Sequence, residues 1–231
     1  MNQNADKNLR QLVLERYYAQ VAQGVQRFTH PTSVRDPHSD SRVENAYTAP
    51  ARPELVRRLK LLTEHFEATF LVRVAVAQEQ LQKPFFVLAD FPEAADETQP
   101  ELFSADGAAS VLLTRLFSRL GMDGHVHRSF ALKALPRRGF TAPLVALCQE
   151  MLECELLLCA PAFVICFGAR AASMLEAIAH VKLEPVGPSA VFEWRGLSVR
   201  PFVFPSPREL ATFPEWRAGV WEELQALGPT R

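Results

Sequence analysis

The sequence predicts an α/β fold in which a mainly parallel sheet lies between two layers of helices. From residue 53 onward, segments with a helical apolar stripe alternate with short runs of continuous apolar residues. Such runs are typical of strands that a parallel sheet buries on both faces. The 231 residues, 48% hydrophobic and 22% charged, are enough for one domain with a substantial core and a smaller appendage.

The first 52 residues are expected to form the appendage, an N-terminal helix followed by a polar linker. Apolar residues recur at spacings of three and four over residues 1–28, which predicts a helix. Residues 29–53 are polar and rich in Pro and Ser, as in a linker or surface loop. The arm is mildly basic, and both a solvated arm and a nucleic-acid-binding arm fit that charge. The α/β domain then extends over residues 53–231.

The first half of the domain contains two predicted helices and three predicted strands. Apolar faces indicate helices in PELVRRLKLLTEHF (53–66) and in GAASVLLTRLFSRLG (107–121), where Gly121 closes the helix. The strands are expected at 71–77 (LVRVAVA), 84–90 (PFFVLAD) and 126–132 (VHRSFAL).

The second half continues the alternation. TAPLVALCQEMLECELLLC predicts a helix with Thr141 as its N-cap, and FVICFG (163–168) predicts a strand that leads into the helix ARAASMLEAIAH. A hairpin is expected around Arg195 and Gly196. The strand PFVFPS (201–206) and the helix PEWRAGVWEELQAL complete the domain.

A ligand site is expected where the parallel strands end, because open α/β sheets bind ligands at the carboxyl ends of their strands. The segments at that edge are 89–92, 132–138, 168–170 and 204–208. Residues 89–106 hold six carboxylates and no Lys or Arg, whereas residues 113–138 hold six Lys or Arg and one Asp. The formal net charge is −1, so a uniformly basic coat is excluded. The charges are either solvated helix faces or a local arrangement that orients a polyanion.

Common nucleotide-binding loops are not expected at the first strand. No glycine lies between Gly24 and Gly107, whereas a phosphate-cradling loop needs glycines directly after the strand.

The cysteine pattern favours a reducing compartment and buried thiols. Cys148, Cys154, Cys159 and Cys166 lie within an apolar stretch, and their spacing matches no common zinc site. The start, MNQNADKNLRQ, lacks a signal-peptide core, and no apolar run reaches the roughly 18 residues that a membrane span needs. We therefore expect a cytoplasmic protein without a membrane segment and without a bound metal.

The order of these segments resembles the uracil-DNA glycosylase superfamily, in particular the bacterial and archaeal families that bind an iron–sulfur cluster. The similarity covers residues 54–226. It rests on FFVLADFPEAADE, PELFSADGAAS, VLLTRLFSRLGM, VHRSFALKALPRR, the helix–strand–helix PLVALCQEMLECELLLCAPAFVICFGARAASML, and RPFVFPSPREL. The resemblance implies the glycosylase-like three-layer α/β/α fold.

For catalysis, the resemblance implies a role for Asp90. The family places a carboxylate or an amide at this position to orient or activate the water that attacks the sugar. The last family motif begins with a His that donates to the departing base, but this chain has Phe204 there. Because Phe cannot donate, and loss of such a donor typically costs about 10²- to 10³-fold in rate, normal uracil excision is not expected.

The resemblance also implies a base pocket and a set of DNA contacts. The pocket candidates are Ala89, Phe91, Pro92, Phe103, Ser129, Phe130 and Phe204. The candidate DNA contacts are Lys133, Arg137, Arg138, Ser206 and Arg208, with Leu210 as the wedge that enters the duplex when a base is extruded.

The iron–sulfur cluster of the resembled families is expected to be lost. Their ligand positions fall at His65, Ala68, Ala134 and Cys148. One thiolate cannot hold a cluster that needs four converging donors.

Three functions remain open on this basis. The first is a divergent, inactive glycosylase scaffold that retains DNA binding. The second is an active glycosylase that uses Asp90 on another damaged base. The third is a protein-interaction or structural module that binds a partner through its cleft and its N-terminal helix.

Overall fold

The computed structural model describes residues 50–70, 83–92, 108–133 and 141–227. The predicted helix at 1–28, most of the linker that follows it and the predicted strand at 71–77 lie outside these ranges. No described helix is long and apolar enough to cross a membrane.

The centre of the fold is a mixed sheet whose four main strands are parallel. These are β1 (Phe85–Ala89), β2 (Val126–Phe130), β3 (Phe163–Phe167) and β6 (Leu197–Phe204). The order across the sheet is β2-β1-β3-β6-β4, in which β4 (Gly187–Pro188) is an antiparallel edge strand. A further strand, β5 (Phe192–Trp194), pairs with β6 in the hairpin that the sequence predicts, and Arg195 and Gly196 turn with positive φ.

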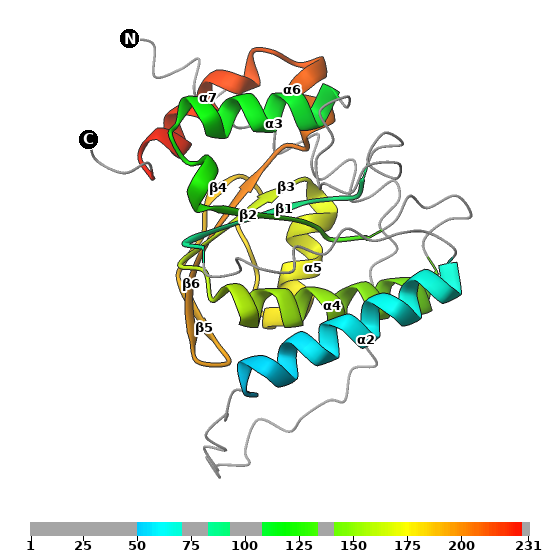
Figure 1. The fold of residues 1–231 in the computed structure, drawn as a ribbon. Coiled ribbons are helices and arrows are strands. Elements are labelled where there is room, and N and C mark those ends of the chain that lie inside the picture. Colours follow the sequence, from blue (N-terminus) through cyan, green and yellow to red (C-terminus); the bar gives the residue numbers. More distant parts are fainter. Residues whose placement is uncertain (1–49, 71–82, 93–107, 134–140, 228–231) are drawn as a thin grey trace, which may run out of the picture.

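Helices cover both faces of the sheet, which gives the predicted three layers (Figure 1). One face carries α3 (Ala108–Arg119), α6 (Pro207–Thr212) and α7 (Trp216–Gln225). The other carries α4 (Ala142–Cys159) and α5 (Ala169–Ala179), and α2 (Arg52–Phe70) packs against α4.

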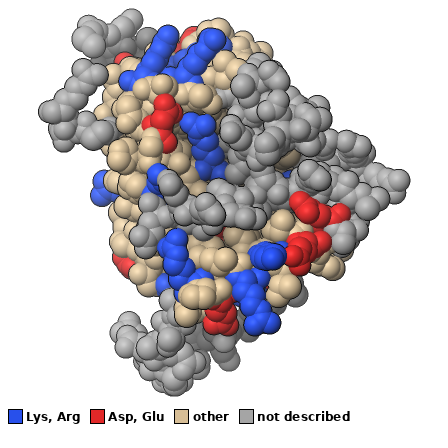
Figure 2. Space-filling model, in the orientation of Figure 1, with Lys and Arg blue, Asp and Glu red and all other residues tan. Residues whose placement is uncertain are grey.

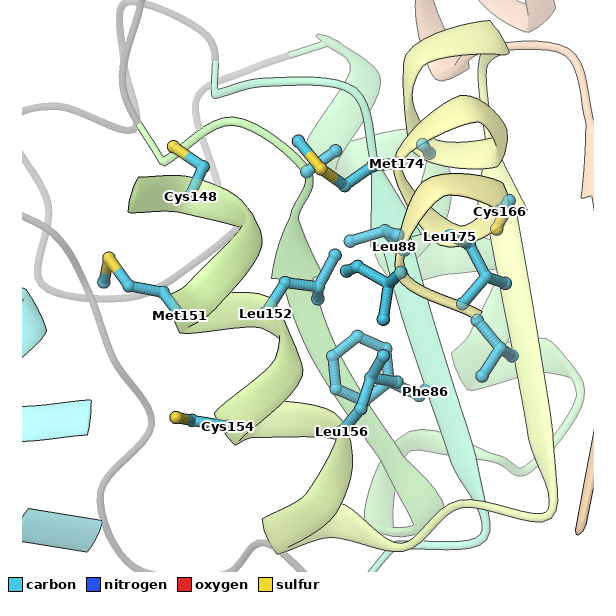
Figure 3. Packing of buried hydrophobic residues seen from close by; sticks show 14 of the residues in the cluster. Phe86, Leu88, Cys148, Met151, Leu152, Cys154, Leu156, Cys166, Met174 and Leu175 are labelled. Carbon is cyan, nitrogen blue, oxygen red and sulfur yellow. The ribbon is translucent and has the colours of Figure 1, made fainter. Parts of the chain in front are cut away.

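Strand β1 shows why its apolar residues are consecutive and do not alternate with polar residues. All five of its residues are buried, because Phe86 and Leu88 face α4 and α5 whereas Phe85, Val87 and Ala89 face α3 and α7. Figure 3 shows Phe86 and Leu88 packed among apolar side chains of α4 and α5. A strand between two helical layers has no solvent face to make polar.

The C-terminal part differs from the prediction in two details. The segments LSVR and PFVF form one strand, β6, which passes through Pro201; this residue has no N–H, and its carbonyl accepts a hydrogen bond from the backbone N–H of Ser189. Helix α6 was not predicted. Its signal is a capping box in which Ser206 and Glu209 satisfy each other's backbone N–H groups, with Pro207 in the first turn.

Candidate functional site

The parallel strands end together at the edge where the site is expected. The last residues of β1, β3 and β6 are Ala89, Phe167 and Phe204, which lie in register across the sheet. The helices that follow the neighbouring strands β1 and β3, α3 and α5, cover opposite faces (Figure 1). This is the switch point at which α/β sheets form a crevice, and Asp90 and Gly168 are its first residues.

Asp90 is held at the amino end of α5. Its Oδ1 atom accepts a hydrogen bond from the backbone N–H of Ala171 at 2.9 Å. A Cβ atom on Gly168 would lie only 2.2 Å from Asp90 Oδ2, so the carboxyl group occupies the space that a side chain at residue 168 would need. Gly168 is the N-cap of α5 with φ 107° and ψ 161°, a conformation essentially confined to glycine. The contact therefore requires glycine at this position.

Burial dominates the electrostatics of Asp90. Desolvation raises the pKa of this carboxyl group to about 6, although the backbone N–H of Ala171 and the charge of Arg170 favour the ionised form. The carboxylate of Glu209 raises the pKa further. Asp90 consequently changes charge near neutral pH, in the range that suits a general base or acid.

Two cationic side chains accompany Asp90 at this edge. Arg170 lies in the first turn of α5, and its charge acts on Asp90. Arg208 lies in the first turn of α6, with its Cζ atom 5.0 Å from the centroid of the Phe91 ring. At this distance the guanidinium is attracted to the negative face of the ring.

Ser206 does not present its hydroxyl to solvent as a simple phosphate contact. The Ser206 hydroxyl accepts a hydrogen bond from the backbone N–H of Glu209 at 3.3 Å and donates one to the Glu209 carboxylate at 2.8 Å. Its role in the structure is to begin α6.

Two aromatic candidates for the base pocket, Phe130 and Phe204, lie in the core. Phe204 is 3% exposed and packs on Phe167 and Phe202, with ring centroids 5.6 Å and 6.3 Å away. Phe130 and Ala89 are buried in the same cluster beneath α3 and α7. These side chains face the helical layer because period-two alternation directs them there, so the pocket role that the resemblance implies is corrected to core packing for Phe130 and Phe204. Pro92 is buried as well.

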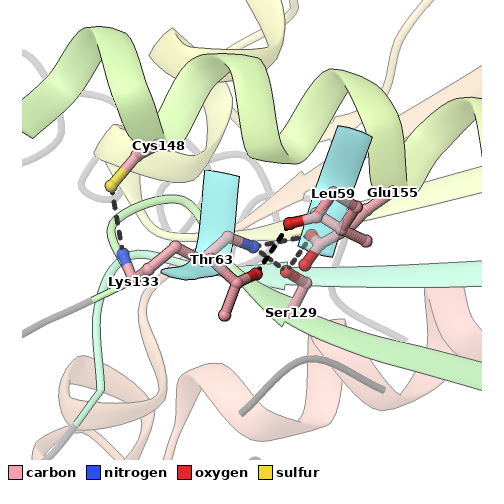
Figure 4. Close-up of polar contacts among 6 residues, drawn as sticks. All are labelled: Leu59, Thr63, Ser129, Lys133, Cys148 and Glu155. Carbon is pink, nitrogen blue, oxygen red and sulfur yellow. Dashed lines mark hydrogen bonds and ion pairs between the residues drawn. The ribbon is translucent and has the colours of Figure 1, made fainter. Parts of the chain in front are cut away.

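Ser129 and Lys133 belong to a second polar cluster, inside the domain (Figure 4). Lys133 Nζ lies 2.6 Å from Glu155 Oε2 on α4, and both side chains are 2% exposed. The Ser129 hydroxyl donates to the same carboxylate oxygen at 2.6 Å and accepts from Lys133. The backbone N–H of Lys133 donates to Cys148 Sγ. The expected surface contact of Lys133 with DNA and the expected base contact of Ser129 are therefore corrected, because both polar groups are engaged with a buried carboxylate that needs them.

His127 lies beside this cluster on the same face of β2. Its ring packs on Phe86 at 4.8 Å between centroids, and its Nε2 atom is buried without a hydrogen-bond partner among the described residues. Burial lowers the pKa of His127, while Glu155 raises it and Lys133 lowers it. The imidazole is consequently neutral at neutral pH.

Leu210 is also placed differently from the expectation. It is 2% exposed and packs in the cluster of α3, α6 and α7. The hydrophobic face of the short helix α6 needs this burial, so Leu210 does not project as a wedge.

The cysteines are buried thiols that lie apart on α4 and β3. Burial raises the pKa of Cys148, Cys154 and Cys159 to about 11, and that of Cys166 further still. No group of three or more His, Cys, Asp or Glu side chains with the placement of metal ligands occurs among the described residues. Cys148 supplies an acceptor to Lys133 instead.

Three further candidates, Phe103, Arg137 and Arg138, lie outside the described residues. On the face shown in Figure 2, the basic side chains form several separate groups with acidic side chains between them. The described part of this face carries no single continuous basic surface.

The sequence matches no model of a known protein family, and no curated protein matches it.

Proposed function

We propose that this protein is a divergent scaffold of the uracil-DNA glycosylase type that binds DNA at the carboxyl edge of its sheet and does not excise uracil. The observation that carries the proposal is a contrast among the described residues of this edge: the cations Arg170 and Arg208 are present, whereas Phe204 stands where the resembled families have a donor for the departing base.

The loss of excision is supported by Phe204 and Asp90. Phe204 stands where the resembled families have a donor for the departing base, and its ring is packed against Phe167 in the core. Asp90 has one carboxyl oxygen committed to the amide of Ala171. An enzyme of this type would need a donor at the first position and a carboxylate directed to a water at the second.

DNA binding is supported by Arg170 and Arg208. Each lies in the first turn of a helix that begins at the carboxyl edge, and Arg208 is exposed while it packs over Phe91. Guanidinium groups bind phosphate through paired N–H donors, and the positive end of the α5 dipole is directed to the same edge. These features suit a phosphate backbone better than a neutral ligand.

The test is the salt dependence of duplex binding, measured by fluorescence anisotropy for wild type, Arg208→Ala and Arg200→Ala. Arg200 is the matched control, because it is an exposed Arg on β6 that pairs with the start of β3, at the opposite edge of the sheet. We expect wild-type affinity to fall linearly in a plot of log K against log salt, and Arg208→Ala to reduce the slope by about one. Arg200→Ala should leave the slope unchanged.

Two outcomes would refute the proposal. One is the absence of wild-type binding at about 50 mM salt, or a flat salt plot. The other is an equal loss in both variants, which would place binding elsewhere.

A second candidate function, excision of another damaged base by Asp90, is favoured by the pKa of about 6 that burial gives this carboxyl group. Such a value keeps much of the group ionised at neutral pH and able to accept a proton. Excision on a panel of lesion duplexes by wild type and Asp90→Asn decides this candidate. It requires wild-type activity on at least one lesion and its loss in Asp90→Asn, whereas equal rates reject it.

A further inference from the structure

The outward face of α3 carries two cations and no acid. The exposed side chains of residues 111–119 are Thr114, Arg115, Ser118 and Arg119. On the opposite side of the helix, Leu113 and Phe117 are buried in the cluster that α3 forms with the sheet. Residues four apart are neighbours on a helix surface, so the two guanidinium groups and the two hydroxyl groups form adjacent pairs on one face. The helix Ala108–Arg119 contains no Asp or Glu.

The acids that adjoin this face are engaged by other groups. Asp123, which follows α3 in the chain, is paired with Arg128 at 3.3 Å. The carboxylate of Glu209, the acid of α6, is bonded in the capping box of its own helix. Among the described residues, neither Arg115 nor Arg119 forms an ion pair, so both charges can meet an anion from outside.

The outward face of α3 continues from the carboxyl edge of the sheet. Helix α3 lies between the parallel strands β1 and β2 in the chain, so it runs from the carboxyl edge toward the opposite one. It packs against α6, which begins at the carboxyl edge and carries Arg208. Figure 2 shows Lys and Arg side chains that project from the layer in which Figure 1 places α3 and α6. The 12 residues of α3 span about 18 Å, a length over which a duplex carries about ten phosphate charges.

We propose that the outward face of α3 is a second contact surface for the phosphate backbone of duplex DNA. Arg115 and Arg119 bind neighbouring phosphates, and the hydroxyls of Thr114 and Ser118 supply further donors. The inference rests on the proposed DNA-binding function and extends its contact surface from the carboxyl edge onto α3.

The composition of this face suits phosphates better than an acidic protein. Guanidinium and hydroxyl groups are common partners of the phosphate oxygens of DNA. Protein interfaces are instead centred on aromatic and apolar anchors. The large apolar side chains that are exposed in the described part of the chain, Val56, Leu61 and Val191, all lie outside α3. Phosphate contacts carry no base information, so binding through α3 should not depend on the sequence of the duplex.

The experiment measures the salt dependence of duplex binding by fluorescence anisotropy for wild type, Arg115→Ala/Arg119→Ala and the control Arg52→Ala/Arg57→Ala. The control removes two exposed Arg residues from α2, on the other side of the sheet, and changes the net charge by the same amount. Each phosphate contact contributes about −0.9 to the slope of log K against log salt, so the α3 variant should reduce the magnitude of the slope by about two. The α2 variant should keep the wild-type slope.

Folding of the variants is not expected to limit the test. All four Arg residues are exposed on helices, where Ala is the most favourable replacement. Arg115→Gln/Arg119→Gln removes the same charges with longer side chains and should give the same slope as the Ala variant.

Two further measurements identify the occupant. The α3 variant should lose the same slope on two duplexes of unrelated sequence, and a loss on one duplex alone would indicate base contacts and overturn the assignment to phosphates. Polyglutamate is the probe for an acidic protein. If the α3 variant loses polyglutamate binding while its duplex slope stays at the wild-type value, the face binds acidic protein and the inference is overturned.

The outcomes also distinguish this inference from the function on which it rests. A wild-type slope in the α3 variant, or an equal reduction in the α2 control, would overturn the contact through α3. DNA binding at the carboxyl edge would remain intact if Arg208→Ala still reduced the slope. Absence of wild-type duplex binding at about 50 mM salt would overturn the proposed function and this inference together.

Discussion

Two carboxylates on the α4–α5 side of the sheet, the partly buried Asp90 and the buried Glu155, are compensated in different ways. Glu155 is buried and is matched by the Lys133 ammonium and the Ser129 hydroxyl. Asp90 has backbone N–H donors at the amino end of α5 and a favourable charge interaction with Arg170. The first acid is compensated in full by a buried cation, whereas the second is compensated in part and changes charge near pH 6.

This difference gives the two acids different expected roles, one in stability and one in binding. A buried ion pair with a bridging hydroxyl has no unsatisfied atom with which to meet a ligand, and it fixes the position of β2 on α4. A partly compensated acid at the switch point remains responsive to protons and to charged ligands. We therefore expect variants of Glu155 to alter stability and variants of Asp90 to alter binding.

The largest expected effect is the loss of one partner of the buried pair. Glu155→Leu leaves the Lys133 ammonium buried without its counter-charge, and we expect a loss of about 3–5 kcal/mol in the free energy of unfolding. Urea denaturation provides the measurement. The matched control is the double variant Lys133→Met/Glu155→Leu, which removes both charges and should recover most of the loss.

A loss below about 1 kcal/mol for Glu155→Leu, the range of an exposed ion pair, would contradict the compensated burial of Glu155. An equally unstable double variant would show that apolar packing, and not charge, determines the effect.

The next largest expected effect tests the close approach of Asp90 to α5. Gly168→Ala places a methyl group on the Asp90 carboxyl group and strains a backbone with φ 107°, so we expect a loss of about 3 kcal/mol. Gly196→Ala is the control, because φ is 80° there but nothing lies within 4 Å of the added Cβ. It should lose only about 1–2 kcal/mol by urea denaturation. Equal losses would mean that the carboxyl group does not restrict residue 168.

The pH dependence of stability distinguishes the two acids more finely. The folded-state pKa of Asp90, about 6, lies above the ordinary 3.8, so between these values the folded chain holds a proton that the unfolded chain has released. This contribution is fully present below about pH 4 and is lost as pH rises through 6, by about 3 kcal/mol in total. Asp90→Asn should lack this decline when unfolding free energies are compared at pH 4, 5, 6 and 7. A wild-type curve parallel to that of the variant would contradict it.

The smallest expected effect concerns His127, beside the buried pair. Burial lowers its folded-state pKa below 6.5, so the unfolded chain binds a proton that the folded chain does not. Stability is therefore present above pH 6.5 and declines as pH falls below it, the opposite sign from Asp90. His127→Gln should flatten this acid-side decline in the same denaturation series, and His125→Gln, an exposed control, should leave it unchanged. An unaltered decline in His127→Gln would assign it to other groups.

The central strands could be predicted from the sequence because a strand that is buried on both faces is a run of consecutive apolar residues. FFVLA and FVICF have no polar residue, and both form central strands where they are predicted. Helix α6 and the short strand β4 escaped the prediction, since a six-residue helix and a two-residue strand have no periodicity to detect. The capping box at Ser206 was the available signal for α6.

The candidate site was predicted only at the level of the edge. The rule on carboxyl ends indicated Asp90 and Gly168, which the structure brings together. It could not reveal that Lys133 turns inward, because the partner that holds it, Glu155, lies 22 residues away on α4. A long-range ion pair has no local sequence pattern, whereas the identity of a strand end does.

The most direct measurement of the central claim is a titration of uracil-containing duplex in which binding and excision are determined on the same samples. We expect saturable binding at about 50 mM salt that weakens steeply with added salt, while every uracil stays attached to its strand. Release of uracil by wild type would contradict the claim that excision is lost, and failure to bind the duplex under these conditions would contradict the claim that the carboxyl edge holds DNA.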